Sequence, residues 1–104
     1  MSNPTPKITL CTYRLKPGKE PEFRQLLEKH WPTMRQLGLI AEQPAHQVFR
    51  GENDQGVYYV EVFPWKDESA MHRAHQLPEV ASVWEPMGTC CTAMEFPDVE
   101  HVQI

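Results

Sequence analysis

The sequence lacks the features that mark nucleic-acid-binding and membrane proteins. It has 10 Lys and Arg against 14 Asp and Glu, which gives a net charge of −4, and no basic cluster offsets this. Nucleic-acid binding depends mainly on Lys and Arg side chains that neutralise phosphate charges, so this negative net charge argues against a nucleic-acid partner. The longest apolar runs are far shorter than the roughly 20 residues that cross a bilayer, and the N-terminal MSNPTPK has no apolar signal segment. We therefore expect a cytoplasmic protein with no membrane partner.

Motifs for metals, cofactors and nucleophilic catalysis are also missing. The 3 cysteines include the adjacent pair Cys90 and Cys91, whose bridge would close a strained ring, so reduced and buried thiols are expected. There is no CxxC, zinc-site spacing, Ser-His-Asp order or glycine-rich phosphate loop. We predict no cofactor and no metal. A metal or haem protein stays open as a third alternative because the chain has 5 histidines.

What the sequence does contain is the pattern of one α+β domain spanning residues 1–104. Alternating β-favouring residues predict strands, apolar residues at three- and four-residue spacing predict helices, and 1–6 and 98–104 are expected to be arms. The predicted strands are 7–15, 45–52, 57–63 and 90–96. The predicted helices are 21–37 and 67–85, the second interrupted at 77–78 and closed by Pro86 and Gly88. The order βαββαβ is that of a ferredoxin-like fold, an antiparallel sheet with both helices on one face.

The strand at 57–63 indicates that a second copy of the chain is needed. Successive side chains of a strand point to opposite faces, and here both faces are apolar or aromatic. One face carries Tyr59, Glu61 and Phe63, and the other carries Tyr58, Val60 and Val62. Two helices can cover only one of these faces. We therefore expect a homodimer in which two sheets cover each other.

Three segments resemble the antibiotic-biosynthesis-monooxygenase-like family of the dimeric α/β barrel superfamily. They are KPGKEPEF, VEVFPWKDESAMHRAH and TAMEF, and the resemblance covers roughly residues 7–97. It implies a homodimer whose two sheets close into a barrel, with a pocket in each subunit between sheet and helices. Members of this family include cofactor-free oxygenases of aromatic polyketides, haem-degrading enzymes and isomerases. The family's third-strand glutamate matches Glu61, and its helical histidine matches His72 or His75.

Two histidines and one glutamate are the candidate catalytic groups. His72 and His75 are three residues apart on a predicted helix and can share a face. Glu61 in mid-strand either faces the pocket, where burial would raise its pKa and suit it to general-base work, or pairs with Arg14 or Arg50. We assign His75 or His72 as the base and Glu61 as the residue that orients it.

The remaining candidates are ligand-binding residues beside the predicted pocket. Pro32 inside the first helix is expected to kink it near its histidine and tryptophan, which opens space between helix and sheet. The aromatic and histidine side chains expected to bind a ligand are Tyr59, Phe63, Trp65, Trp84, His30 and Trp31. Two functions remain open: a cofactor-independent monooxygenase or isomerase acting on a small aromatic or polyketide-like molecule, and a non-catalytic dimer that binds a small apolar or aromatic ligand or serves as a stress-related protein.

Overall fold

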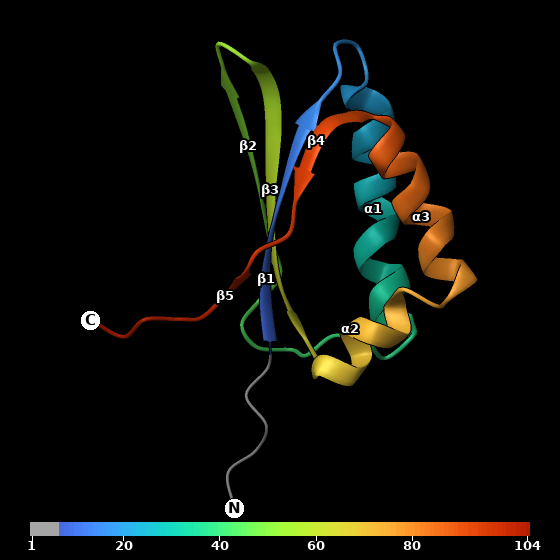
Figure 1. Ribbon diagram of the computed structural model, residues 1–104, viewed down its shortest axis with the longest axis vertical. Helices are drawn as coiled ribbons and strands as arrows, with labels where there is room; N and C mark the ends of the chain where they lie inside the picture. The colour runs from blue at the N-terminus through green and yellow to red at the C-terminus, as the bar shows by residue number, and fades with distance from the viewer. Residues whose placement is uncertain (1–6) are drawn as a thin grey trace, which may run out of the picture.

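The molecule is an antiparallel sheet of five strands, four of them longer and the last of 2 residues, covered on one face by helices (Figure 1). The structure is a computed structural model and describes residues 7–104, so the expected arm at 1–6 lies outside the described residues. The elements follow the order β1 (Lys7–Leu15), α1 (Glu20–Gln36), β2 (Gln47–Asn53), β3 (Gly56–Trp65), α2 (Glu68–Ala74), α3 (Pro78–Thr89), β4 (Cys91–Glu95) and β5 (Asp98–Val99). The strand order is β2-β3-β1-β4, and the short β5 pairs with β1. The predicted ferredoxin-like α+β fold is confirmed.

The helices follow the sequence signals closely at three of their ends. Pro21 lies in the first turn of α1, and Gly38 follows its end with a φ of 70°, a conformation that favours glycine. The α1 helix continues through Pro32 as one element. Asp67 caps α2, since its side chain accepts a hydrogen bond from the backbone N–H of Ala70.

The end of the second helical segment differs from the prediction. The interruption predicted at 77–78 separates α2 from α3, but α3 runs to Thr89 rather than closing at Pro86 and Gly88. Pro86 removes only the backbone hydrogen bond to the carbonyl four residues earlier. The apolar side of α3 is buried against the sheet through Val80, Val83 and Met87, and this packing outweighs the missing bond. None of the helices in the described part of the chain has the length and apolarity needed to cross a membrane.

The core lies between the helices and one face of the sheet. Side chains of β1 alternate between buried and half-buried positions, and the buried ones are Thr9, Cys11, Tyr13 and Leu15. On β3 the buried side chains that alternate along the strand are Tyr59, Glu61, Phe63 and Trp65, and Pro64 is buried as well. The face that carries Glu61 is therefore the face that the helices cover.

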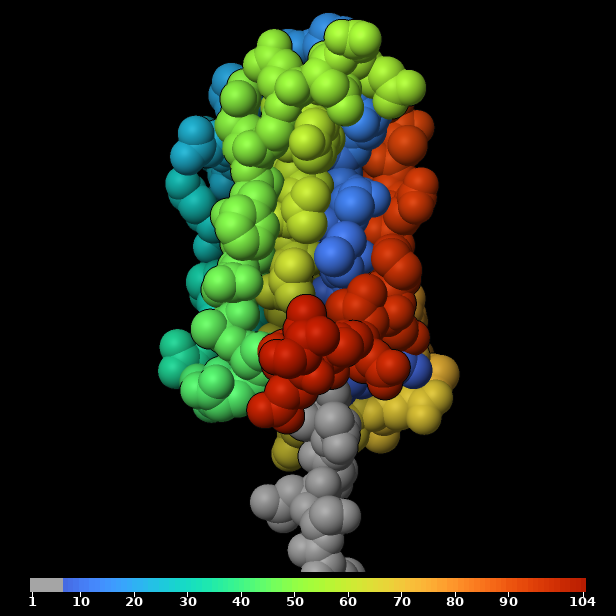
Figure 2. Space-filling view, turned by 90° about the vertical axis from the view of Figure 1, so that its left-hand side faces the viewer, coloured from blue at the N-terminus to red at the C-terminus, as the bar shows by residue number. Residues whose placement is uncertain are grey.

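The opposite face of the sheet is open. Figure 2 shows the four strands side by side on this face, where only the C-terminal segment of the described chain lies across them. Half-buried apolar residues from the two central strands lie here: Ile8, Leu10, Val60 and Val62. Phe49 of β2 pairs with Val60 and is 54% exposed. The segment expected to be an arm at 98–104 begins with the short strand β5, and residues 100–104 beyond it have no regular structure.

Candidate functional site

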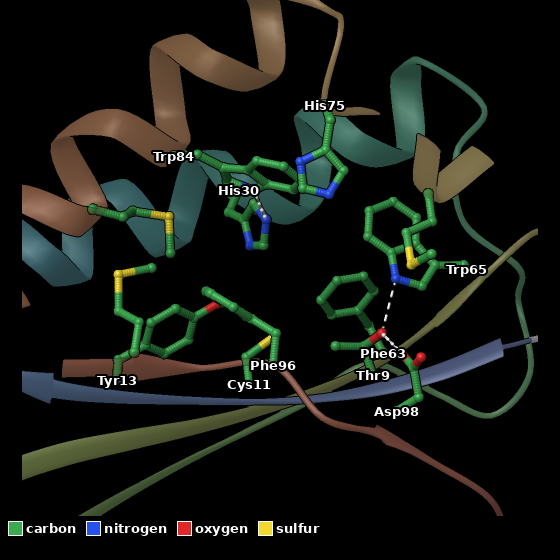
Figure 3. Close-up of a pocket in the computed structure, with 13 residues that line it drawn as sticks. Thr9, Cys11, Tyr13, His30, Phe63, Trp65, His75, Trp84, Phe96 and Asp98 are labelled. Atoms are coloured by element: carbon green, nitrogen blue, oxygen red, sulfur yellow. Dashed lines mark hydrogen bonds between the residues drawn. The ribbon is translucent and has the colours of Figure 1, made fainter. Parts of the chain in front are cut away.

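A cavity of about 310 Å³ lies between the helices and the sheet. Figure 3 shows the side chains of the helices above it and those of the strands below. Thirteen residues line it, most of them aromatic or sulfur-containing: Thr9, Cys11, Tyr13, His30, Phe63, Trp65, Met71, His75, Trp84, Met87, Met94, Phe96 and Asp98. Flat faces and polarisable sulfur atoms of this kind favour an aromatic ligand.

The polar groups at one end of the cavity bind one another. The indole Nε1–H of Trp65 donates to Thr9 Oγ1 at 2.9 Å, and that hydroxyl donates to the carboxylate of Asp98 at 3.3 Å (Figure 3). Asp98 also pairs with the ammonium group of Lys7 at 3.2 Å. Because these groups already have partners, this end holds the C-terminal strand in place rather than offering free donors to a ligand.

The Glu61 carboxylate organises a buried polar network behind the cavity. Its side chain is 0% exposed and accepts hydrogen bonds from two elements and one connection. Tyr13 donates its hydroxyl to Oε1 at 2.7 Å, His30 Nδ1 lies 3.1 Å from both carboxylate oxygens, and His46 Nε2 lies 2.8 Å from Oε2. A buried carboxylate needs several donors to offset its lost hydration, and these three side chains supply them.

Two sequence-based interpretations of Glu61 are corrected by this geometry. Burial raises its pKa, but the hydrogen bonds from His30, His46 and Tyr13 outweigh burial and lower the pKa from 4.5 to about 2. Glu61 is therefore an ionised hydrogen-bond acceptor and not a general base. Neither arginine is its partner: Arg14 lies over the ring of Tyr58 on the open face, and Arg50 binds Glu20.

Stability is expected to depend on pH through Glu61. Because its pKa is lower in the folded protein than the ordinary 4.5, the unfolded chain binds the proton first as the pH falls. Its contribution is complete above about pH 4.5 and is lost as the pH approaches about 2. Urea denaturation at a series of acidic pH values measures this contribution, as the difference in the free energy of unfolding between the wild type and Glu61→Gln. Parallel profiles for the two proteins would contradict it.

The hydrogen bonds of His30 fix the position of its proton. An indole N–H is only a donor, so Trp84 Nε1, which lies 2.9 Å from His30 Nε2, must donate to a lone pair there. The proton of the neutral ring is then on Nδ1, where it is donated to Glu61. This arrangement directs the basic nitrogen of His30 towards Trp84 and the cavity, as Figure 3 shows.

Two further titratable groups on the cavity wall stay protonated at neutral pH. Burial and the nearby Glu61 charge raise the pKa of Cys11 to about 12. Burial and the same carboxylate also raise the pKa of Tyr13 well above 10. Because a thiolate, and not a thiol, is the reactive form of cysteine, Cys11 is not a nucleophile here.

The structure brings five of the nine predicted site residues to the cavity and leaves four outside its wall. His30, Phe63, Trp65, His75 and Trp84 line the cavity, His75 at an exposed position. Glu61 lies behind the wall. The other three have different partners: His72 is exposed near Glu68 at 3.8 Å, Tyr59 donates its hydroxyl to Glu20 at 2.7 Å, and Trp31 stacks on His46.

Sequence reasoning did not identify Tyr13 and His46 as partners of Glu61. A signal for Tyr13 exists in the alternation of β1, which places it on the helix side, diagonally across from Glu61 on the neighbouring strand. His46 falls inside the strand predicted at 45–52, but β2 begins at Gln47, so His46 lies in the connection before it and strand alternation does not place its side chain. Within residues 7–104, no group of three or more His, Cys, Asp or Glu side chains could hold a metal ion.

Comparisons with known proteins give matches in structure only. No protein-family model matches the chain, and no curated protein sequence matches it. A crystal structure of an antibiotic biosynthesis monooxygenase aligns with a TM-score of 0.75 and 15% identity, over 93% of this chain and 99% of that one. SnoaB, a cofactor-independent oxygenase from Streptomyces nogalater, aligns with a TM-score of 0.74 and 17% identity, over 96% and 97%.

A third match has no activity in its name. Rv0793 from Mycobacterium tuberculosis aligns with a TM-score of 0.73 and 13% identity, over 96% of this chain and 98% of that one. All three alignments span nearly the whole of both chains, so the similarity concerns the complete domain and not one motif. The chain therefore has the fold of the antibiotic biosynthesis monooxygenases.

Proposed function

We propose that the protein is a cofactor-independent monooxygenase that acts on a small aromatic or polyketide-like molecule, with His30 as its general base. The observation that carries the proposal is the geometry of His30. Its Nδ1–H is held by the ionised Glu61 at 3.1 Å, and its Nε2 lone pair points to an aromatic cavity. A carboxylate in this position keeps an imidazole in one tautomer and stabilises the imidazolium that forms when the base takes a proton.

The base is assigned to His30 rather than to the two histidines of the second helical segment. His72 is exposed and lies outside the cavity, and His75 lies at its exposed edge. His30 is 2% exposed. A buried base suits a reaction whose intermediate must be kept from water.

The reaction requires a proton transfer followed by the addition of molecular oxygen. His30 Nε2 takes a proton from an activated CH₂ group of the substrate and leaves a carbanion, which reduces O₂ as it forms a carbon–oxygen bond. The O–O bond then breaks. One oxygen atom stays in the product as a carbonyl, and the other leaves as water with the two protons that the substrate carbon has lost. Oxygen accepts all four electrons, so no further reductant is needed.

Replacing His30 by glutamine is expected to abolish oxygen consumption almost completely. The amide keeps a donor for Glu61 but cannot accept the substrate proton, and a general base contributes at least about a hundredfold to a rate. The measurement is oxygen uptake with a panel of hydroxylated aromatic compounds under air. His72→Gln is the matched control, because its side chain is exposed and should leave the rate unchanged. Equal rates for both variants would reject His30 as the base.

A non-catalytic ligand-binding protein is the second candidate, and one observation favours it. The Nε2 lone pair of His30 already accepts the indole N–H of Trp84, so no free base faces the cavity in this state. A substrate must displace that hydrogen bond before it can lose a proton. If aromatic compounds quench tryptophan fluorescence on binding and the wild type consumes no oxygen with any of them, binding alone is the function.

We also propose that the protein is a homodimer. The open face of the sheet carries half-buried apolar side chains on β1 and β3, and Phe49 on the edge strand β2 is 54% exposed. Soluble monomers rarely leave an apolar patch of several hundred Å² in water. A second copy is the occupant that the fold suggests, because two such faces are of the same size and shape.

A further inference from the structure

Glu61 is shared by two imidazoles with different access to solvent. His30 approaches both carboxylate oxygens from α1 and has a side chain that is 3% exposed. His46 approaches Oε2 from the connection before β2, and its side chain is 19% exposed. One negative charge therefore serves an inner histidine on the cavity wall and an outer histidine that water reaches.

The outer histidine is held rigidly in this place. Its ring stacks on that of Trp31 with a centroid distance of 4.1 Å and an interplanar angle of 4°. Trp31 follows His30 directly on α1, and the edge of its ring meets Phe63 at 6.2 Å between centroids. The same turn of helix thus supplies the inner histidine and the surface on which the outer one lies.

We propose that His46 is a positioning residue for the His30 base and acts through the Glu61 carboxylate that both imidazoles contact. The inference rests on the proposed function, in which His30 takes the substrate proton. When His46 is neutral, the whole charge of Glu61 is available to stabilise a proton on His30. When His46 is protonated, its positive charge pairs with the Glu61 carboxylate. The same positive charge repels a second one on His30, so protonation of His30 becomes less favourable.

The geometry makes this coupling strong. The bonded nitrogens of the two histidines lie within about 6 Å of each other, because both contact Oε2. At an effective dielectric constant of about 20, two charges at that separation change each other's proton affinity by a factor of about 100. Sites coupled this strongly titrate as a pair, in two steps.

The other titratable groups around His30 and His46, apart from His75, do not change their protonation state in the pH range where histidines titrate. From β1, Cys11 has a pKa of about 12 and Tyr13 a pKa well above 10, so both stay neutral where histidines titrate. From β3, Glu61 has a pKa of about 2 and stays ionised. His75, at the C-terminal end of α2, is separated from His30 by the ring of Trp84, which lies 5.1 Å from the His75 ring.

The test is an NMR titration of the histidine rings in the absence of any substrate. In the wild type, the His30 signals should move in two steps as the pH falls, because the two imidazoles share one carboxylate. In His46→Gln, whose amide N–H still serves Glu61, His30 should bind its proton in one step with about tenfold or greater affinity than in the wild type. His72→Gln, with an exposed histidine, should leave the His30 curve unchanged.

A one-step His30 curve in the wild type would overturn the proposal, and this outcome does not depend on whether the variant folds. An identical His30 curve in wild type and His46→Gln would overturn it as well. Because no substrate is present, the result is independent of the proposed function: coupling without oxygen consumption would reject the enzyme and keep the coupled pair. If oxygen consumption is found, the acidic limb of its pH profile should move to higher pH with His46→Gln, because His30 then holds its proton more tightly, and should stay in place with His72→Gln.

Discussion

Glu61→Gln is expected to lower the free energy of unfolding by about 3–5 kcal/mol, the usual effect of removing one partner from a buried ionic network. The carboxylate accepts from Tyr13, His30 and His46, and all of these are donors. Glutamine has the same size but only one acceptor oxygen, and its NH₂ group would face a donor. At least one buried donor then has no partner. Urea denaturation at neutral pH measures the loss.

Glu28→Gln is the matched control for this change. Glu28 is an exposed carboxylate on α1, so its replacement should alter the free energy of unfolding by less than about 0.5 kcal/mol. A second measurement distinguishes the loss of the hydrogen-bond network from a change in packing alone. The ring of His30 should lose its fixed tautomer in Glu61→Gln, which NMR of the imidazole nitrogens would report. A variant as stable as the wild type would show that Glu61 does not hold the network together.

The fold could be predicted from local patterns because each strand and helix carries its own period. The alternation at 7–15 predicted β1 with its observed ends, and the period-2 pattern of 57–63 placed Glu61 on the same face as Phe63. The end of α3 was wrong because Pro86 and Gly88 are stop signals only when packing does not override them. Burial of Val83 and Met87 is a tertiary effect that no local pattern contains.

The sequence indicated which residues lie near the site better than it indicated which of their atoms contact one another. Several of the aromatic residues and histidines expected beside the predicted pocket line the cavity. Which atoms meet depends on how β1, α1 and the connection before β2 pack around Glu61, and these segments are far apart in sequence. One of the two alternatives that the sequence left open for Glu61 was therefore a carboxylate with a raised pKa, whereas three donors from those segments lower its pKa to about 2.

The open face of the sheet leads to the prediction of a homodimer that a single charge disrupts. Burial of about 1,000 Å² of apolar surface represents roughly 25 kcal/mol at about 25 cal/mol per Å². Association costs an estimated 4–15 kcal/mol in lost translational and rotational freedom, so a large surplus remains. The monomer should not persist at micromolar concentration, and light scattering should give twice the mass of one chain.

Val60→Asp is expected to abolish this dimer. Val60 lies on the open face of the central strand β3, opposite Thr12 of β1 and Phe49 of β2. In a dimer formed through this face its carboxylate would be buried in the interface without a partner, which costs several kcal/mol for each charge. The variant should therefore scatter light as a single chain or as a less stable species. Gln25→Asp, on the exposed side of α1, places the same charge on the helical layer and should leave the mass unchanged. A wild type with the mass of one folded chain, or a Val60→Asp protein that stays dimeric and equally stable, would show that the open face of the sheet is not the dimer interface.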